Sequence, residues 1–220
     1  MSYNWGLQRM IEKSYSDFAR GLREDGQLSA AGSYYSSSAF GYLMKFRSIE
    51  RKQNKKEILP TKLGYFSRNI LLGALCHRIT GNDSRTELLC RQGVLAIKEV
   101  LDHEPLFQKP EREAPIGLCH EMIADFRVTG KLDSPNQSYF ESKKYYKEVG
   151  NQRRWSVEPE FEVHLNTLVK LTNAINHELP SEKESQMRNS LVDRIEYKEE
   201  NFEKIIKKVV EVGNWDSDLL

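Results

Sequence analysis

The sequence predicts an all-α fold in which helical hairpins follow one another along the chain. Apolar residues recur at the spacing of an amphipathic helix, whereas the alternating pattern of strands is nearly absent. Turn signals at Gly26, Gly81, Gly130 and Pro180 lie about 50 residues apart. Because a repeated two-helix unit of this size is typical of a stacked array, we expect about eight antiparallel helices in four hairpins.

The first three hairpins are expected within residues 1–150. Apolar stripes and stop signals predict six helices there, at about residues 2–24, 29–47, 61–79, 83–101, 114–129 and 134–149. In the first helix, Ile11, Tyr15, Phe18 and Leu22 share one face, which predicts that this face packs against the next helix. A polar stretch from residue 48 to residue 61 connects the first two hairpins.

Residues 151–220 are expected to form a C-terminal helical hairpin that caps the same array. Its first helix is predicted at 159–178, and its second at about 181–212, where Ser181 and Glu184 have the spacing of a capping box. The second helix can cover the end of the array or pair with a second copy as a homodimer. We favour capping, since the terminal hairpin otherwise exposes an apolar stripe. The stripe consists of Met187, Leu191, Ile195, Phe202, Ile206 and Val209.

Composition narrows the class of protein. The 220 residues contain 33 Lys and Arg against 32 Asp and Glu, which excludes both a bulk polycation and an acidic shell. No apolar run approaches the ~18 residues of a membrane span. Arg9 and Lys13 interrupt the first apolar stretch, which argues against a secretory signal. Three cysteines cannot form a closed disulfide framework, so we expect a cytoplasmic protein.

The first hairpin resembles a complete tetratricopeptide repeat. The third hairpin repeats the first-helix half of the pattern, the second keeps part of it, and the fourth shows no match. The matching residues are Tyr15, Phe18, Ala19, Leu22, Gly26, Leu28, Ala31, Tyr35 and Ser38 in the first hairpin, Leu72, Gly73 and Cys76 in the second, and Cys119, Met122, Ile123, Phe126, Gly130 and Leu132 in the third. The resemblance implies a tetratricopeptide-like right-handed superhelix. It also implies that Phe18 packs inside its hairpin, that Ala19 and Ala31 let two helix backbones meet, and that Gly26 makes the turn.

Members of that family mostly bind peptides or partner proteins in a concave groove lined by the first helix of each repeat. The resemblance therefore implies a non-catalytic scaffold or regulatory adaptor. Five of the groove positions are Lys or Arg and none is acidic, which favours an acidic peptide or partner protein. The alternative is an ordinary solvated helix face, where any helix carries charge. The expected partner-binding residues are Lys13, Arg20, Arg23, His77, Arg78, His120 and Arg127, beside Ser16, Ser67, Ile70, Ala74, Gly117 and Ala124.

A basic segment supports a second hypothesis, a nucleic-acid-binding helical protein. Six basic residues against Glu50 give residues 45–56 a net charge of plus five, and Arg153-Arg154-Trp155 adds a basic site with an aromatic ring. A solvated helix end and connection is the more ordinary explanation of such a run. The six basic residues are Lys45, Arg47, Arg51, Lys52, Lys55 and Lys56.

Cysteine and histidine adjoin in Cys76-His77 and Cys119-His120, which raises a third hypothesis, a metal- or cysteine-dependent enzyme. Adjacent residues on a helix diverge by ~100°, so neither pair can chelate as a unit, and buried structural cysteines are the simpler interpretation. The sequence contains no phosphate-binding glycine loop or nucleophile elbow. We therefore expect no metal, no cofactor and no catalytic residue.

Overall fold

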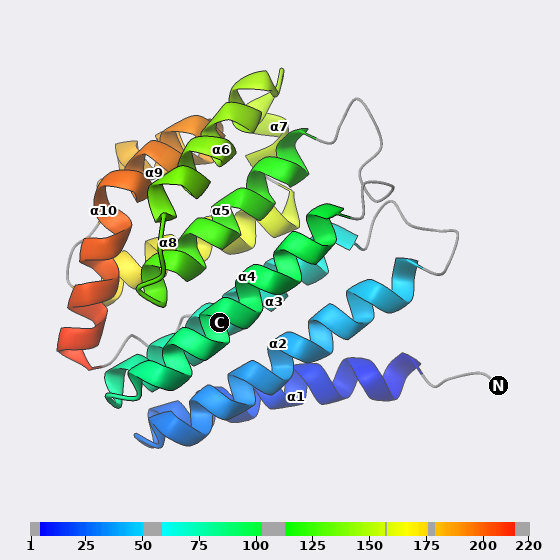
Figure 1. The fold of residues 1–220 in the computed structure, drawn as a ribbon, viewed down its shortest axis with the longest axis vertical. Coiled ribbons are helices and arrows are strands. Elements are labelled where there is room, and N and C mark those ends of the chain that lie inside the picture. Colours follow the sequence, from blue (N-terminus) through cyan, green and yellow to red (C-terminus); the bar gives the residue numbers. More distant parts are fainter. Residues whose placement is uncertain (1–4, 51–58, 103–112, 157, 176–178, 214–220) are drawn as a thin grey trace.

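The structure, a computed structural model, describes residues 5–50, 59–102, 113–156, 158–175 and 179–213. Within these residues the chain forms ten α-helices and no strand, which confirms the predicted all-helical class. The helices pack mainly against their neighbours in the sequence, and the first three hairpins lie side by side in chain order (Figure 1). These hairpins pair α1 (Trp5–Glu24) with α2 (Leu28–Glu50), α3 (Leu59–Ile79) with α4 (Asp83–Asp102), and α5 (Glu113–Thr129) with α6 (Pro135–Glu148).

Between residues 152 and 213, where the structure leaves out 157 and 176–178, the chain forms four helices where two were expected. They are α7 (Gln152–Ser156), α8 (Pro159–Ala174), α9 (Ser181–Asn189) and α10 (Leu191–Val212). The predicted final helix is broken at Ser190, whose hydroxyl accepts a hydrogen bond from the Asp193 amide at 3.1 Å and so caps α10. The capping box at Ser181 is not formed, because Ser181 already lies inside α9 behind Pro180.

Helices α8 and α10 pack along α3 and α5 rather than only beyond the end of the array (Figure 1). The face of α3 and α5 that was expected to line a groove is closed as well: Ile70, for example, packs beside Gly93 of α4. Ser67, Ile70, Ala74 and Ala124 on that face have no exposed surface. The apolar stripe of the last helices is likewise buried inside the chain, so in this arrangement it offers no surface to a second copy.

The face of α1 that is buried differs from the face that the sequence predicts. Ser16, Ala19 and Arg23 form its buried face, whereas 52% of Phe18 is exposed, so the expectation that Phe18 packs inside the hairpin is wrong. The physical reason is that the neighbouring face of α3 is partly polar: the Ser16 hydroxyl donates a hydrogen bond to Oδ1 of Asn69 at 3.3 Å. Phe18 instead lies edge-on against Tyr34, with ring centroids 4.7 Å apart.

Two glycines of the repeat pattern serve different purposes. Gly26 has a φ of 74°, a left-handed conformation that favours glycine and allows the tight turn between α1 and α2, as expected. At Gly130 there is no room for a side chain. A Cβ there would lie 2.6 Å from Cβ of Cys90, so a glycine at this position lets the end of α5 approach α4 closely.

Candidate functional site

The most strongly charged part of the interior lies between α5, α8 and α10. Glu121 and Asp125 are one turn apart on α5, and Arg194 and Lys198 are one turn apart on α10. His164 on α8 lies beside them. All five side chains are buried, and together they are called the charge cluster below.

Each carboxylate of the charge cluster is paired with a cation. One Arg194 guanidinium nitrogen donates to Oε2 of Glu121 at 2.6 Å. The Lys198 ammonium lies 2.8 Å from Oε1 of Glu121 and 2.5 Å from Oδ2 of Asp125, so it bridges the two acids. The two acidic and two basic side chains therefore balance in charge, as buried ions must for a stable fold.

Neighbouring polar groups complete the charge cluster. The Tyr146 hydroxyl donates to Oε2 of Glu121 at 2.7 Å, and the Tyr139 hydroxyl donates to Oδ1 of Asp125 at 2.9 Å. Arg194 also donates to the backbone carbonyl of Phe161 at 3.1 Å, which links α10 to α8. Hydrogen bonds of this kind offset much of the cost of removing the ions from water.

The pKa shifts of Glu121 and Arg194 agree with an ion pair in which both groups stay charged. Burial alone would raise the pKa of Glu121, but Arg194 and then Lys198 outweigh burial, and the pKa lies far below its usual range. Burial opposes the charged form of Arg194 as well, yet Glu121 raises its pKa. Glu121 and Arg194 therefore both stay ionised near neutral pH.

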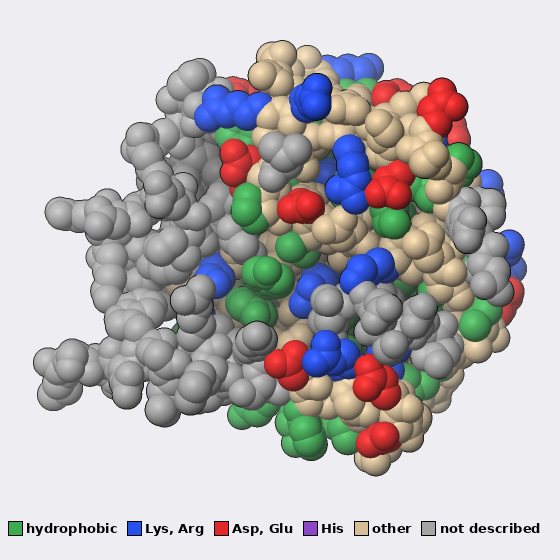
Figure 2. Space-filling model, turned by 180° about the vertical axis from the view of Figure 1, so that it is seen from behind, with side chains coloured by type: hydrophobic (Ala, Val, Ile, Leu, Met, Phe, Trp, Pro, Cys, Tyr) green, Lys and Arg blue, Asp and Glu red, His purple; other side chains and the backbone are tan. Residues whose placement is uncertain are grey.

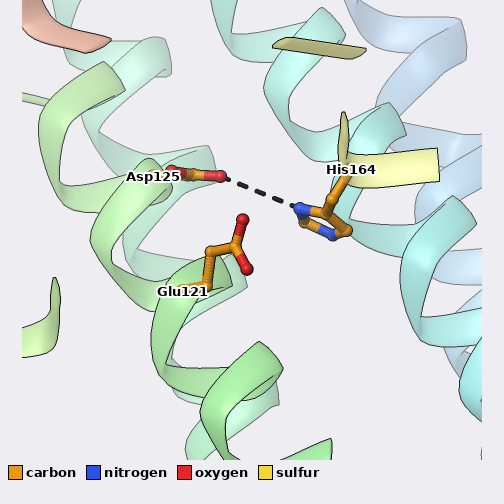
Figure 3. A group of neighbouring side chains, drawn as sticks. All are labelled: Glu121, Asp125 and His164. Carbon is orange, nitrogen blue, oxygen red and sulfur yellow. Dashed lines mark ion pairs between the residues drawn. The ribbon is translucent and has the colours of Figure 1, made fainter. Parts of the chain in front are cut away.

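His164 completes a group of three possible metal ligands with Glu121 and Asp125 (Figure 3). Its Nδ1 lies 3.8 Å from Oδ2 of Asp125. Burial lowers the pKa of His164, and Asp125 opposes this only in part, so the imidazole is neutral at neutral pH. Its Nε2 has no hydrogen-bond partner among the described residues.

The three ligand atoms lie within 4.8 Å of one another, as a metal site requires. However, the Lys198 ammonium already lies between the two carboxylates, in the place of a cation. A divalent ion would add two charges to a set that is already balanced, and burying unbalanced charge is costly. The chemistry of these residues therefore fits a buried structural network and does not fit a metal centre.

The charge cluster also lacks room for a substrate. The space between Asp125, His164 and Lys198 is lined on its other sides by Arg68, Leu71, Thr167, Leu168 and Phe202, and is too small to admit a water molecule. A catalytic group must reach its substrate, so the charge cluster as it stands is not an active site.

The charge cluster was missed from the sequence, although a signal was present. Glu121 and Asp125 enclose the apolar run Met122, Ile123 and Ala124 on a helix that is buried on nearly all sides. Acidic residues in such a helix must either pair with cations or stay protonated. Arg194 and Lys198 have the matching four-residue spacing, but no pattern in the sequence pairs them across 73 positions.

The expected partner-binding residues lie in different environments. Arg23 and His77 are buried, with His77 packed against Gly32. Arg20 pairs with Asp17 on the same helix at 3.3 Å, and the ring of His120 stacks on Tyr145. Lys13 lies in α1, but its side chain is outside the described residues.

Arg78 and Arg127 do line one groove, which encloses about 710 Å³ and is called the interaction groove below. It lies where the turns after α3 and α5 approach the last turns of α10. Four cationic and three acidic side chains line it, so its net charge is plus one. They are Arg78, Arg127, Lys131 and Lys207 against Asp83, Glu203 and Glu211, with Gly81, Val128, Leu132, Pro135 and Val210 completing the surface.

Both arginines of the interaction groove are anchored to backbone. Arg78 donates to the carbonyl of Thr129 at 2.9 Å, and Arg127 donates to the carbonyl of Ser134 at 3.0 Å. Lys131 lies 3.4 Å from Asp83, with both side chains more than 60% exposed. On the face seen from behind, basic and acidic side chains alternate rather than forming one basic field (Figure 2).

The residues of the nucleic-acid hypothesis lie mostly outside the described side chains. Lys45 is buried, which removes it from any surface that grips phosphate. The side chains of Arg47, Arg51, Lys52, Lys55 and Lys56 are outside the described residues. The Arg154 guanidinium lies over the Trp155 ring, 5.7 Å from its centroid, so this aromatic surface is already covered on one side.

The three cysteines are free and buried, as the structural interpretation predicted. Burial raises the pKa of each thiol, at Cys76, Cys90 and Cys119, to about 12. A nucleophilic cysteine needs a thiolate near neutral pH, so none of the three has the required chemistry.

No family model, curated protein or solved structure matches this chain. Among the helices of the described residues, none has both the length and the apolar character needed to cross a membrane.

Proposed function

We propose that this protein is a non-catalytic interaction scaffold that binds an acidic peptide segment in the interaction groove. The observation that carries the proposal is that Arg78 and Arg127, two expected partner-binding residues, line the same groove although they come from different hairpins. Two further cations, Lys131 and Lys207, border it.

The lining of the groove favours a particular kind of peptide. Val128, Leu132 and Val210 provide an apolar surface for one or two apolar side chains. The exposed ammonium groups of Lys131 and Lys207 can pair with carboxylates. The three acidic lining residues repel acidic side chains placed elsewhere, so they select the positions of the carboxylates within the peptide.

We propose that the hairpins around this groove form a tetratricopeptide-like superhelix. The first helix of each hairpin is its leading helix, and α8 and α10 fill the face that the leading helices form. Binding then takes place at the ends of the leading helices α3 and α5 rather than along their length. We propose a cytoplasmic location, which the three free cysteines support.

A charge-reversal experiment tests the groove. The probe is a panel of fluorescein-labelled nonapeptides in which tryptophan or leucine stands among aspartates, and binding is measured by fluorescence anisotropy. The double variant Lys131→Glu and Lys207→Glu should weaken binding of the best peptide at least about tenfold, equal to ~1.4 kcal/mol. Both residues are exposed, so the fold is retained.

The matched control is Lys204→Glu with Lys208→Glu, two exposed lysines of α10 outside the groove. The control has the same net charge as the groove variant and should keep the affinity of the unaltered protein. Equal weakening by both variants would mean that binding follows net charge alone and would overturn the groove as the site.

A further inference from the structure

The end of α10 forms one border of the interaction groove. Val210 and Glu211 line the groove, and the helix ends at Val212. Gly213 has a φ of 74°, and a Cβ there would lie 4.0 Å from Cγ2 of Ile79 at the end of α3. The chain therefore leaves α10 beside the helix that supplies Arg78 to the groove.

The residues that follow have the composition that the groove is proposed to bind. Residues 214–220, which lie outside the described residues, read Asn-Trp-Asp-Ser-Asp-Leu-Leu. They contain Asp216 and Asp218, no Lys or Arg, and apolar side chains that begin with Trp215. Seven residues can span about 23 Å when extended.

We propose that residues 214–220 bind in the interaction groove of their own chain and compete there with an external acidic partner. In this arrangement Asp216 and Asp218 pair with the exposed lysines of the groove, and Trp215 contacts its apolar surface. The competition rests on the proposed function, because it requires an external partner at the same groove. Binding of residues 214–220 in the groove does not require an external partner.

Tethering makes such a contact effective even when it is weak. A short connection holds a segment at an effective concentration on the order of 1 mM. A segment that binds with a dissociation constant of ~0.1 mM then lowers the apparent affinity of a competitor about tenfold. A partner must therefore bind more tightly, or be present at a higher concentration, in order to displace the segment.

The first experiment observes the segment itself and needs no partner. The full chain is labelled with 5-fluorotryptophan, and the Trp215 resonance is assigned by its loss in Trp215→Phe. Lys131→Glu with Lys207→Glu should shift this resonance toward that of a free peptide of residues 214–220. Lys204→Glu with Lys208→Glu should leave it unchanged. A Trp215 resonance that is identical in all forms would overturn the proposal.

Dilution distinguishes the chain's own groove from that of a second copy. Binding within one chain is independent of protein concentration, so the Trp215 resonance should stay constant between about 10 µM and 500 µM. A resonance that moves toward the free-peptide position on dilution would show exchange between copies and would overturn binding within the chain.

The second experiment measures the competition. Asp216→Asn with Asp218→Asn, in the full chain, should tighten binding of the nonapeptide probe about tenfold. Glu196→Gln with Glu200→Gln, two exposed acids of α10 outside the groove, provides the control with equal charge change. Equal tightening by both variants would overturn the competition. If no probe binds to any variant, the proposed function fails, while the fluorine spectrum still decides where the segment binds.

Discussion

Among the described residues, two lysine–aspartate pairs connect segments that are distant in the sequence, and the two pairs differ in burial and in distance. Lys198 and Asp125 are 2.5 Å apart and buried between α10 and α5. Lys131 and Asp83 are 3.4 Å apart at the rim of the interaction groove, with more than 60% of each side chain exposed. The first pair is shielded from water on all sides, whereas the second can exchange its partner for water or for a ligand.

The comparison shows how burial decides the role of a charge. In the charge cluster each ion depends on its partner, because an unpaired ion in the interior is strongly unfavourable. At the groove, an exposed pair contributes little to stability, so its members are available for binding. A lysine thus holds the fold together in one place, and in the other it stays exposed to solvent, where we propose that it binds a partner.

The largest expected effect is at the buried pair. Asp125→Asn leaves Lys198 with only Glu121 and weakens the hydrogen bond from Tyr139, so we expect the free energy of unfolding to fall by about 3–5 kcal/mol. Urea unfolding followed by circular dichroism measures it.

A second substitution separates lost charge from lost packing. Adding Lys198→Met to Asp125→Asn removes the cation that was left without its aspartate, and should recover part of the lost stability. If the double variant is as unstable as the sum of the two single variants, the two residues are not coupled and the buried pair does not act as described.

An intermediate effect is expected at Glu160, a buried carboxylate near the start of α8. Among the described residues no basic group perturbs it, and burial raises its pKa from 4.5 to about 7. Between these values the unfolded chain has released the proton while the folded chain retains it, so stability should fall as pH rises from about 4.5 to 7. The total loss is at most about 3 kcal/mol.

Glu160→Gln should remove this part of the pH dependence, because glutamine does not titrate. Unfolding by urea at several pH values between 4.5 and 7.5 tests it. A slope of stability against pH that is the same in the variant and the unaltered protein would contradict the assignment to Glu160.

The smallest effect is expected at the exposed pair. Asp83→Asn is the same substitution as Asp125→Asn, but we expect it to change the free energy of unfolding by less than about 0.5 kcal/mol, and less still at high salt. A loss of 2 kcal/mol or more in the same urea assay would show that the groove rim is structural and would weaken the contrast between the two pairs.

The fold class was predictable because it depends on local patterns. Helix periodicity and turn residues lie within a few positions of one another, and Gly26 and Gly81 both have the positive φ that their turns require. The break at Ser190 was missed, since the apolar stripe continues across it from Met187 to Leu191 and both residues are buried. The buried face of α1 was missed because it includes Ser16 and Arg23, which a hydropathy pattern assigns to the surface.

The candidate site was less predictable because it depends on contacts between distant segments. The first-helix positions were assigned to an open groove, and nothing local shows that other helices bury them. Arg78 and Arg127 remained at the surface because they lie in the last turns of α3 and α5, near the ends that the covering helices leave accessible. Lys131 and Lys207 were not expected there, since they come from a turn and from the last helix.

The distance in sequence between the acids of α5 and the cations of α10 has a consequence for biosynthesis. The pairs Glu121–Arg194 and Asp125–Lys198 are each separated by 73 residues. At a translation rate of roughly 5–20 residues per second, α5 leaves the ribosome several seconds before its counter-ions exist. The nascent hairpins must keep their carboxylates hydrated during that interval, so the last step of synthesis is also the step that lets the middle of the protein close.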